Sequence, residues 1–148
     1  MPLQLDIVTI EGRTYSQEVD MVVAPGSAGE MGILPNHVPL LTSLNTGMLR
    51  IKRGLREEYY AVCSGYMEVL PDRVTVLADT AERADDIDME RAQAARERAQ
   101  EYLLAHAGEA GTMDFSKAEA SLRKAMIRIK VAQTQRRRRG SVHENRPG

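Results

Sequence analysis

Side chains that could carry acid–base, nucleophilic or metal chemistry are few in this sequence and widely separated. It has three histidines and one cysteine in 148 residues, and they lack the close spacing of metal ligands. The sequence has neither a Gly-x-x-x-x-Gly-Lys-Ser/Thr phosphate loop nor a Gly-x-Ser-x-Gly nucleophile elbow. Its acidic run at 85–88 is more simply the exposed start of a helix than a catalytic pair. We therefore predict no catalytic residue and no metal ligand, and an enzyme is the weak alternative.

A second group of side chains, basic ones in the C-terminal part, is suited to binding phosphate. Arg91 and Arg98 are seven residues apart, and Lys124 and Arg128 are four apart, so each pair would share one face of a helix. The two rows can converge if the helices close on each other. Guanidinium groups match phosphate oxygens in shape and charge, so such a cluster could clamp a polyphosphate. A solvated basic face is the simpler alternative.

Two helices must position these basic side chains. The stretch from Asp85 to His106 is rich in Ala, Glu, Gln and Arg and has no Gly or Pro, which predicts a helix at about 88–106 with Asp88 as its N-cap. After two glycines, a second helix is predicted at about 115–135, capped by Asp114. Both carry a stripe with spacings of 3 and 4, formed by Ala92, Ala95, Ala99, Tyr102 and His106 and by Ala118, Leu122, Ala125, Ile129 and Ala132. Residues 85–135 should thus form an antiparallel helical hairpin.

We expect this hairpin to be held weakly. Its stripes consist largely of alanine, which buries little apolar area, and two helices have no core of their own. We therefore expect it to be able to leave its closed form. The basic segment 136–148, which begins with four arginines, has no apolar pattern and is predicted to be a disordered tail.

The first 84 residues have the pattern of an antiparallel β-sandwich. Apolar residues alternate with polar ones at 3–7, 49–52 and 74–76. Turn sequences separate these short runs at intervals of roughly 8 to 12 residues. The alternation implies two sheets packed on one core, so the fold class is a β-sandwich followed by a helical hairpin.

One loop of the predicted sandwich contains an unusually large number of apolar side chains. Residues Gly29 to Leu40 contain two glycines and two prolines that make a rigid bend. Apolar side chains crowd the same stretch and the residue after it, namely Met31, Ile33, Leu34, Val38, Leu40 and Leu41. They either fold back into a local core or form an interface with a partner.

Composition bounds the remaining possibilities. Residues 1–84 have 7 basic and 11 acidic residues, whereas residues 116–139 have 9 basic residues and one acid, so the C-terminal part suits an acidic partner or water. No apolar run approaches the 18 residues of a membrane span, and no leader-like segment begins the sequence. We expect a protein on the cytosolic side. The lone Cys63 is expected to be a small buried hydrophobe.

The loop sequence Gly-Glu-Met-Gly-Ile-Leu-Pro-Asn-His-Val-Pro-Leu resembles the signature of the epsilon subunit of F-type ATP synthases. Further similar runs are Gly47-Met48-Leu49, Gly65-Tyr66-Met67-Glu68-Val69, Val74-Thr75-Val76-Leu77-Ala78-Asp79 and Ala81-Glu82-Arg83-Ala84, and the resemblance covers about 3–132. It implies a sandwich of about ten strands. It also implies a non-catalytic subunit of the central rotor, on the cytoplasmic side of the cell membrane and touching the membrane only through the complex.

The resemblance also implies partner subunits and separate roles for the sandwich and the hairpin. The sandwich would fasten to the gamma subunit and to the ring of c subunits, with Glu30, Ile33, His37 and Leu40 at that interface. The hairpin would inhibit ATP hydrolysis, reaching the alpha and beta subunits in an extended form. Its inhibitory basic helix would act through Arg123, Lys124, Arg128 and Lys130.

A nucleotide site is implied as well, with ATP as a regulatory ligand and no required cofactor. The run Ile87-Asp88-Met89-Glu90-Arg91-Ala92 is similar to the Ile-Asp-x-x-Arg-Ala run through which some bacterial epsilon subunits bind ATP. The arginines of those ATP-binding subunits on the two helices also have counterparts here in Arg98 and Arg128, whereas Lys124 stands where the ATP-binding members have an arginine.

The alternative from another class is a nucleic-acid-binding module that uses the basic helix and the arginine run. The near-neutral total charge and the single phenylalanine, with no tryptophan, speak against it, because base stacking needs aromatic side chains. We therefore expect no nucleic-acid partner.

Overall fold

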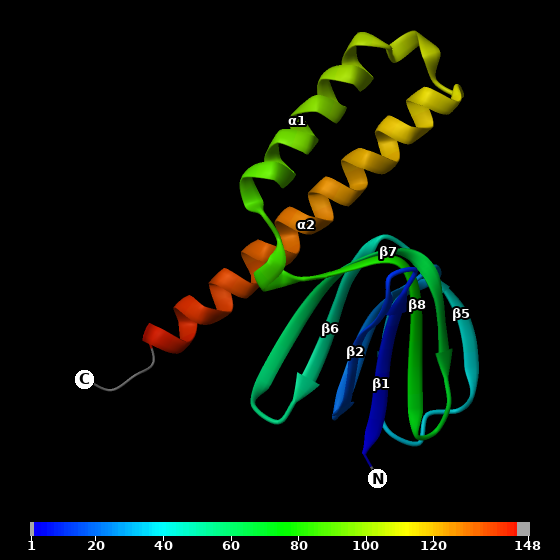
Figure 1. Ribbon diagram of the computed structural model, residues 1–148, viewed down its shortest axis with the longest axis vertical. Helices are drawn as coiled ribbons and strands as arrows, with labels where there is room; N and C mark the ends of the chain where they lie inside the picture. The colour runs from blue at the N-terminus through cyan, green and yellow to red at the C-terminus, as the bar shows by residue number, and fades with distance from the viewer. Residues whose placement is uncertain (1, 145–148) are drawn as a thin grey trace. The chain divides into compact units, whose positions relative to one another are not determined.

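The computed structural model describes residues 2–144, and the side chains of residues 2–140. The chain divides into two compact units, with the division between Ala84 and Asp85. Figure 1 shows that the first unit is made of strands and the second of helices.

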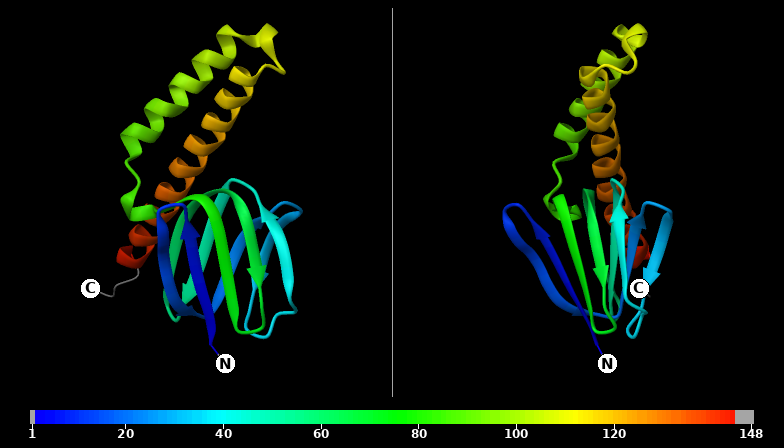
Figure 2. Two further views of the ribbon diagram at one scale, coloured as in Figure 1. Left: turned by 45° about the vertical axis from the view of Figure 1, so that its right-hand side comes forward. Right: turned by 90° about the vertical axis from the view of Figure 1, so that its right-hand side faces the viewer.

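The first unit contains eight strands. They are β1 (Leu3–Thr9), β2 (Gly12–Val19), β3 (Met21–Gly26), β4 (Gly29–Ile33), β5 (Leu40–Leu44), β6 (Gly47–Arg53), β7 (Arg56–Val69) and β8 (Arg73–Arg83). Their order is β2-β1-β8-β7-β5-β3-β4, and β6 pairs with both β3 and β7. All pairs are antiparallel except β1 with β8. Figure 2 shows the strands folded over into facing layers, so the predicted β-sandwich is confirmed.

The strand count differs from the predicted ten, and the long strand β7 pairs with two neighbours along the same edge. The first half of β7 pairs with β6, and its second half pairs with β5. The change occurs at Ser64 and Gly65, which have φ values of 41° and 156°. A Cβ built on Gly65 would lie 1.9 Å from the carbonyl oxygen of Leu77, so only glycine allows the strands this close approach.

The core is formed by the inward side chains of both layers. The largest fully buried ones are Leu3, Leu5, Ile7, Ile33, Leu49, Ile51, Met67, Val22, Val62, Val69, Val74 and Val76. All of them belong to the first unit, so this unit has a hydrophobic core of its own. Cys63 is half-buried and not buried as predicted. It pairs with Thr80 where β7 and β8 run together.

One polar position of the alternation in β1 is a buried carboxylate. Asp6 accepts a hydrogen bond of 2.6 Å from the Ser16 hydroxyl and one from Gln4, and it lies 3.6 Å from Arg73. The Ser16 hydrogen bond is the largest cause that lowers the pKa of Asp6, and burial opposes it. Asp6 thus ties β1 to β2 as a charged group.

Asp6→Asn should destabilise the first unit by about 1–2 kcal/mol at neutral pH, because a charged acceptor is replaced by an amide. A lowered pKa in the folded state means that the stabilisation is present above the unfolded pKa of about 4 and is lost as pH falls through the folded value. Urea unfolding at pH 7 and pH 3 measures this, with the exposed Glu18→Gln as control. An equal difference from wild type at both pH values would contradict the assignment.

The second unit is a helical hairpin. It contains α1 (Met89–Ala105) and α2 (Met113–Glu144), joined by a short 3-10 turn at Ala107–Glu109. Another 3-10 turn, Ala84–Asp86, begins at the last residue of the first unit. Asp88 is the N-cap of α1, as predicted, and accepts a hydrogen bond from the Arg91 backbone N–H at 3.1 Å. The predicted cap Asp114 is wrong, because the hydroxyl of Thr112 accepts from the Phe115 backbone N–H and Asp114 lies inside the first turn.

The predicted stripes face the contact between α1 and α2. Ala92 and Ala99 are buried on α1, and Ala125, Ile129 and Ala132 are buried on α2. At the far end of α1, His106 stacks on Tyr102 with a centroid distance of 4.0 Å. The helical period therefore located the packed faces correctly.

The end of α2 and the disordered tail were predicted wrongly. The helix continues beyond Gln135 through all four arginines to Glu144, and residues 145–148 lie outside the described part of the chain. Arginine is a good helix former, and no proline occurs between the start of α2 and position 147. Arg139 also gains a partner, since it pairs with Asp85 at 2.7 Å. The absence of an apolar pattern did not prevent the helix from continuing.

Candidate functional site

The loop between β4 and β5 lies at one end of the sandwich. Asn36 has a positive φ of 66° at the bend, and its backbone N–H donates to the carbonyl of Pro71 at 2.8 Å. The same end contains Asp72, whose carbonyl accepts from the backbone of Gln4 at 2.9 Å. The β4–β5 loop is therefore fixed against the β7–β8 turn, as a rigid docking surface requires.

The apolar side chains of this segment divide between the core and the surface. Ile33 is fully buried, so it cannot contact a partner and its predicted interface role is wrong. Leu40 is half-buried and packs against the core. Leu34, Val38 and Leu41 instead expose more than half of their surface. We call these three residues the end patch.

The two polar residues predicted for the interface lie in different surroundings. Glu30 is exposed on β4 and forms an ion pair of 3.2 Å with Arg50 on β6. His37 is half-buried, and its Nδ1 lies 2.7 Å from the Val38 carbonyl oxygen. Both side chains can still reach a partner subunit. For Glu30, that contact would compete with the ion pair to Arg50.

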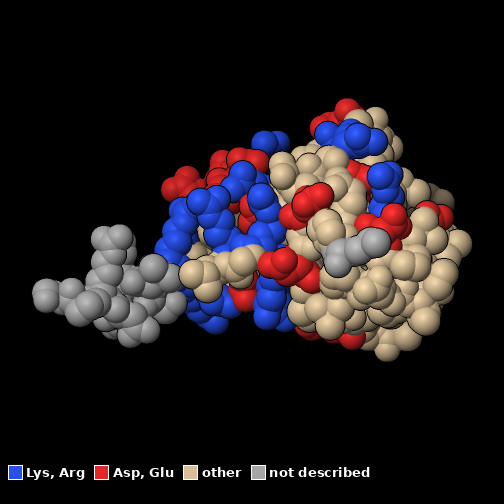
Figure 3. Space-filling view, turned by 90° about the horizontal axis from the view of Figure 1, so that it is seen from below, with Lys and Arg blue, Asp and Glu red and all other residues tan. Residues whose placement is uncertain are grey.

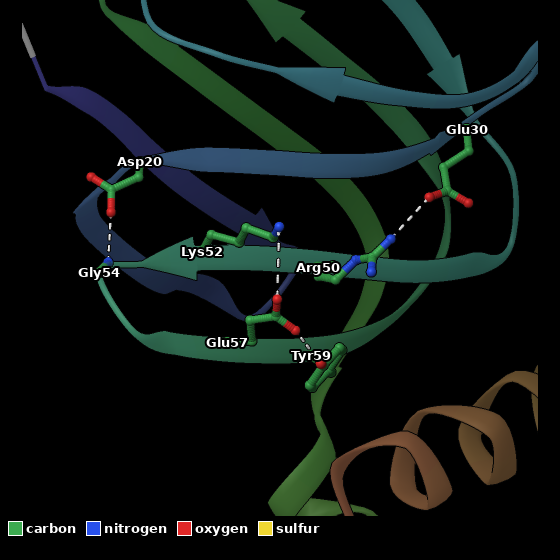
Figure 4. A network of polar contacts seen from close by, with 7 residues as sticks. All are labelled: Asp20, Glu30, Arg50, Lys52, Gly54, Glu57 and Tyr59. Carbon is green, nitrogen blue, oxygen red and sulfur yellow. Dashed lines mark hydrogen bonds and ion pairs between the residues drawn. The ribbon is translucent and has the colours of Figure 1, made fainter. Parts of the chain in front are cut away.

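Polar contacts continue from Glu30 along the neighbouring strands (Figure 4). Lys52 and Glu57 form an ion pair of 3.8 Å across the β6–β7 hairpin, and the Tyr59 hydroxyl donates to Glu57. The carboxylate of Asp20 accepts from the Gly54 backbone N–H. These contacts join β4 to β6, β6 to β7, and the residue before β3 to the β6–β7 turn, and they stiffen this side of the sandwich.

A second apolar surface, which the sequence analysis did not identify, crosses the outer side of three strands. Leu77 on β8 lies beside Val8 on β1 and Tyr66 on β7 in the strand register. Tyr66 is 59% exposed, Leu77 50% and the nearby Ile10 92%, and the group lines a shallow hollow. We call Val8, Ile10, Tyr66 and Leu77 the outer patch. The sequence contains a signal for this patch, because the alternation that places Val74 and Val76 inside the sandwich places Leu77 outside.

The predicted phosphate-binding side chains lie on one side of the hairpin. Each directly precedes a buried residue of the stripe, in the pairs Arg91–Ala92, Arg98–Ala99, Lys124–Ala125 and Arg128–Ile129. One residue corresponds to a rotation of 100°. In two antiparallel helices that face each other, residues that precede the facing ones project to the same side of the pair. The hairpin therefore gathers these four basic residues, which we call the cationic side.

Their heights along the hairpin also agree. At 1.5 Å per residue, Arg91 and Arg128 both lie about 20 Å from the hairpin loop. Arg98 and Lys124 lie closer to the loop, at about 10 and 16 Å. The four groups therefore form a strip whose length suits a chain of phosphates rather than a single one.

The other predicted nucleotide contacts have structural roles. Ile87 is half-buried, Asp88 caps α1, and Ala92 packs in the helix contact. They hold the start of α1, and with it Arg91, in place. In the inhibitory basic helix, Arg123 precedes Lys124 by one residue and Lys130 follows Ile129, so both face away from the cationic side. Figure 3 shows one face of the molecule, on which Lys and Arg gather in one region while much of the remaining surface is uncharged.

The described residues include no group of three or more His, Cys, Asp or Glu that could hold a metal ion. None of the described helices is both long and apolar enough to cross a membrane.

Comparison with protein families gives two matches that divide the chain as the structure does. Residues 2–84 match the β-sandwich domain of the ATP synthase delta/epsilon chain. Residues 85–133 match the long α-helix domain of the same chain. The arginine run at 136–139 lies beyond the second match.

Several curated relatives are named ATP synthase epsilon chain. The one from Desulforamulus reducens is 52% identical over 130 residues, covering 88% of this chain and 96% of the relative. The one from Herpetosiphon aurantiacus is 51% identical over 139 residues, covering 93% and 99%.

Two solved structures have a fold similar to that of this chain. A chain of the Euglena gracilis mitochondrial ATP synthase has a TM-score of 0.64 at 18% identity, covering 89% of this chain and 78% of that one. A chain from the central stalk and c-ring of the Tetrahymena thermophila mitochondrial enzyme has a TM-score of 0.55 at 13% identity, covering 91% and 96%.

Proposed function

The chain belongs to the family of ATP synthase epsilon chains, non-catalytic central-stalk subunits of the F-type enzyme, and from this we propose that its sandwich docks on the rotor while its hairpin regulates ATP hydrolysis. The apolar surfaces of the first unit support docking, and the cationic side of the second supports regulation. The comparisons give no support to the nucleic-acid alternative.

The observation that carries the docking proposal is the pair of apolar patches on a rigid sandwich. The outer patch spans three strands and contains large side chains, so it suits the permanent, extensive contact with the gamma subunit. The end patch, with His37 beside Val38, is smaller and mixed in polarity, and it suits the c-ring. A sandwich with a fully packed core does not deform as these partners turn.

Mild detergent extraction of membranes that contain the complex tests this arrangement. The chain should purify with the gamma subunit and the c-ring, at a ratio of one chain to one gamma subunit. It would then be a peripheral part of the cell membrane complex on the cytoplasmic side, held there by its partners. Recovery of the complex without the chain would overturn the docking proposal.

The regulatory proposal rests on the weak packing of the hairpin. Its buried contact consists mainly of alanines, so little apolar area opposes opening. In an extended form, the basic side chains Arg123, Lys124, Arg128 and Lys130 are suited to acidic surface on the alpha and beta subunits. The extended hairpin would then hold the rotor against hydrolysis.

ATP would favour the closed form, because that form brings the cationic side together. Four positive groups along one side repel one another, and a bound polyphosphate reverses the sign of that interaction. A 100-fold preference of ATP for the closed form shifts the equilibrium by about 2.7 kcal/mol. That is comparable with the modest packing of an alanine contact.

Calorimetry of the isolated chain with ATP should show binding that Arg91→Ala and Arg128→Ala each weaken by about tenfold or more, because each removes a charged contact of about 1.5–3 kcal/mol. Arg123→Ala is the matched control, since it removes the same charge from the opposite side of the hairpin and should leave ATP binding unchanged.

Two results would contradict this site. If the wild-type chain does not bind ATP at millimolar concentration, the chain has no ATP site, and Lys124 in place of an arginine is the departure to test first by Lys124→Arg. If all three variants bind as the wild type does, the site lies elsewhere.

A further inference from the structure

The arginine run that extends α2 has a defined partner within the hairpin unit. The Arg139 guanidinium lies 2.7 Å from the carboxylate of Asp85, and the two residues are 54 positions apart. Asp85 lies in the segment that leads into α1. The pair therefore closes a loop that contains the whole hairpin.

The lengths of the two helices explain why this contact can form. α2 has 32 residues and α1 has 17, which corresponds to about 48 and 26 Å. α1 therefore begins level with about Ile129, and the rest of α2 runs on beside the segment that precedes α1. This overhang carries the arginines, and the opposing segment carries the acids Asp85, Asp86 and Asp88.

We propose that the arginine extension is a latch, in which Arg139 holds the closed hairpin shut by pairing with Asp85. The proposal rests on the proposed regulatory opening of the hairpin. The pair opposes the repulsion within the cationic side, so it stabilises the closed form in the absence of nucleotide. The matched helical family domain ends at residue 133, so the latch is an addition to the domain that the family shares.

The pair is accessible to solvent, which sets the size of its effect. The Arg139 side chain is 66% exposed and that of Asp85 34%. Such pairs change an equilibrium by about two- to fivefold, and salt screens them. The latch is therefore a moderate bias that ionic strength tunes.

Hydrogen exchange of the α1 backbone amides in the full chain, followed by mass spectrometry, measures hairpin opening. Arg139→Gln should speed this exchange by about two- to fivefold at low salt. Arg137→Gln is the matched control, because it removes the same charge about 200° around the helix, and it should leave the exchange unchanged. The swap Asp85→Arg with Arg139→Asp should restore slow exchange, and 0.5 M salt should reduce the difference between wild type and Arg139→Gln.

Unchanged exchange in Arg139→Gln, or the same increase in Arg137→Gln, would overturn the latch. Failure of the swap to restore slow exchange would overturn the direct pairing. The regulatory proposal is tested apart from these measurements, by the ATP hydrolysis rate of the assembled complex. If Arg139→Gln opens the hairpin and the hydrolysis rate stays the same, the latch stands and the regulatory role falls.

Discussion

Leu77→Asp is expected to release the chain from the gamma subunit, with an affinity at least about 100-fold weaker than that of the wild type. Leu77 lies at the centre of the outer patch, between Val8 and Tyr66, so a docked partner would bury an unpaired carboxylate. Such burial costs about 3 kcal/mol or more, which corresponds to the expected factor.

The variant should still fold, because Leu77 faces outward and is half exposed. Leu55→Asp is the matched control. Leu55 is fully exposed between β6 and β7, away from the described patches, so its replacement should leave gamma binding unchanged. Titration of labelled chain with purified gamma subunit measures both affinities, and thermal unfolding checks the fold.

Equal affinity of Leu77→Asp and wild type would remove the outer patch from the gamma interface. Leu41→Asp then separates the two docking surfaces. It changes the end patch, so we expect it to weaken retention on the c-ring while binding of isolated gamma subunit remains.

Deleting residues after Asp85 is expected to raise the rate of ATP hydrolysis by the assembled complex by about 5- to 150-fold, the range of a coupling free energy of 1–3 kcal/mol. The truncated chain should still assemble, because the core of the sandwich is built entirely from the first unit. The deletion removes the whole hairpin, and with it the proposed inhibitory contact.

A hairpin that lacks the four charges of the inhibitory basic helix controls for the loss of mass. Replacing Arg123, Lys124, Arg128 and Lys130 by glutamine keeps both helices but removes the attraction to acidic partner surface, so it should reproduce much of the increase. High salt should act in the same direction in the wild-type complex, because exposed charges are screened beyond about 8–10 Å. If the truncated complex hydrolyses ATP no faster than the intact one, the hairpin does not inhibit.

The elements in which apolar residues recur with a strong period were determined by the sequence itself. The alternation of β1 and β8 and the alanine stripes of α1 and α2 appear where they were predicted, because one buried face per element suffices to fix them. Asp88 was also recognisable as a cap, since capping depends on neighbouring residues alone. These are local properties, which a sequence records directly.

Properties that depend on residues distant in sequence required the tertiary structure. The buried position of Ile33 and the exposed one of Leu34 could not be separated within the apolar run, because the core on the other side of β4 decides which of them turns inward. The outer patch exists because β1, β7 and β8 become neighbours. The end of α2 was misjudged because the missing apolar pattern was given more weight than the helix propensity of the arginines, and because the ion pair to Asp85, 54 residues earlier in the chain, lies outside any local pattern. The sequence thus determined which faces pack, and the tertiary structure decided which exposed residues lie together.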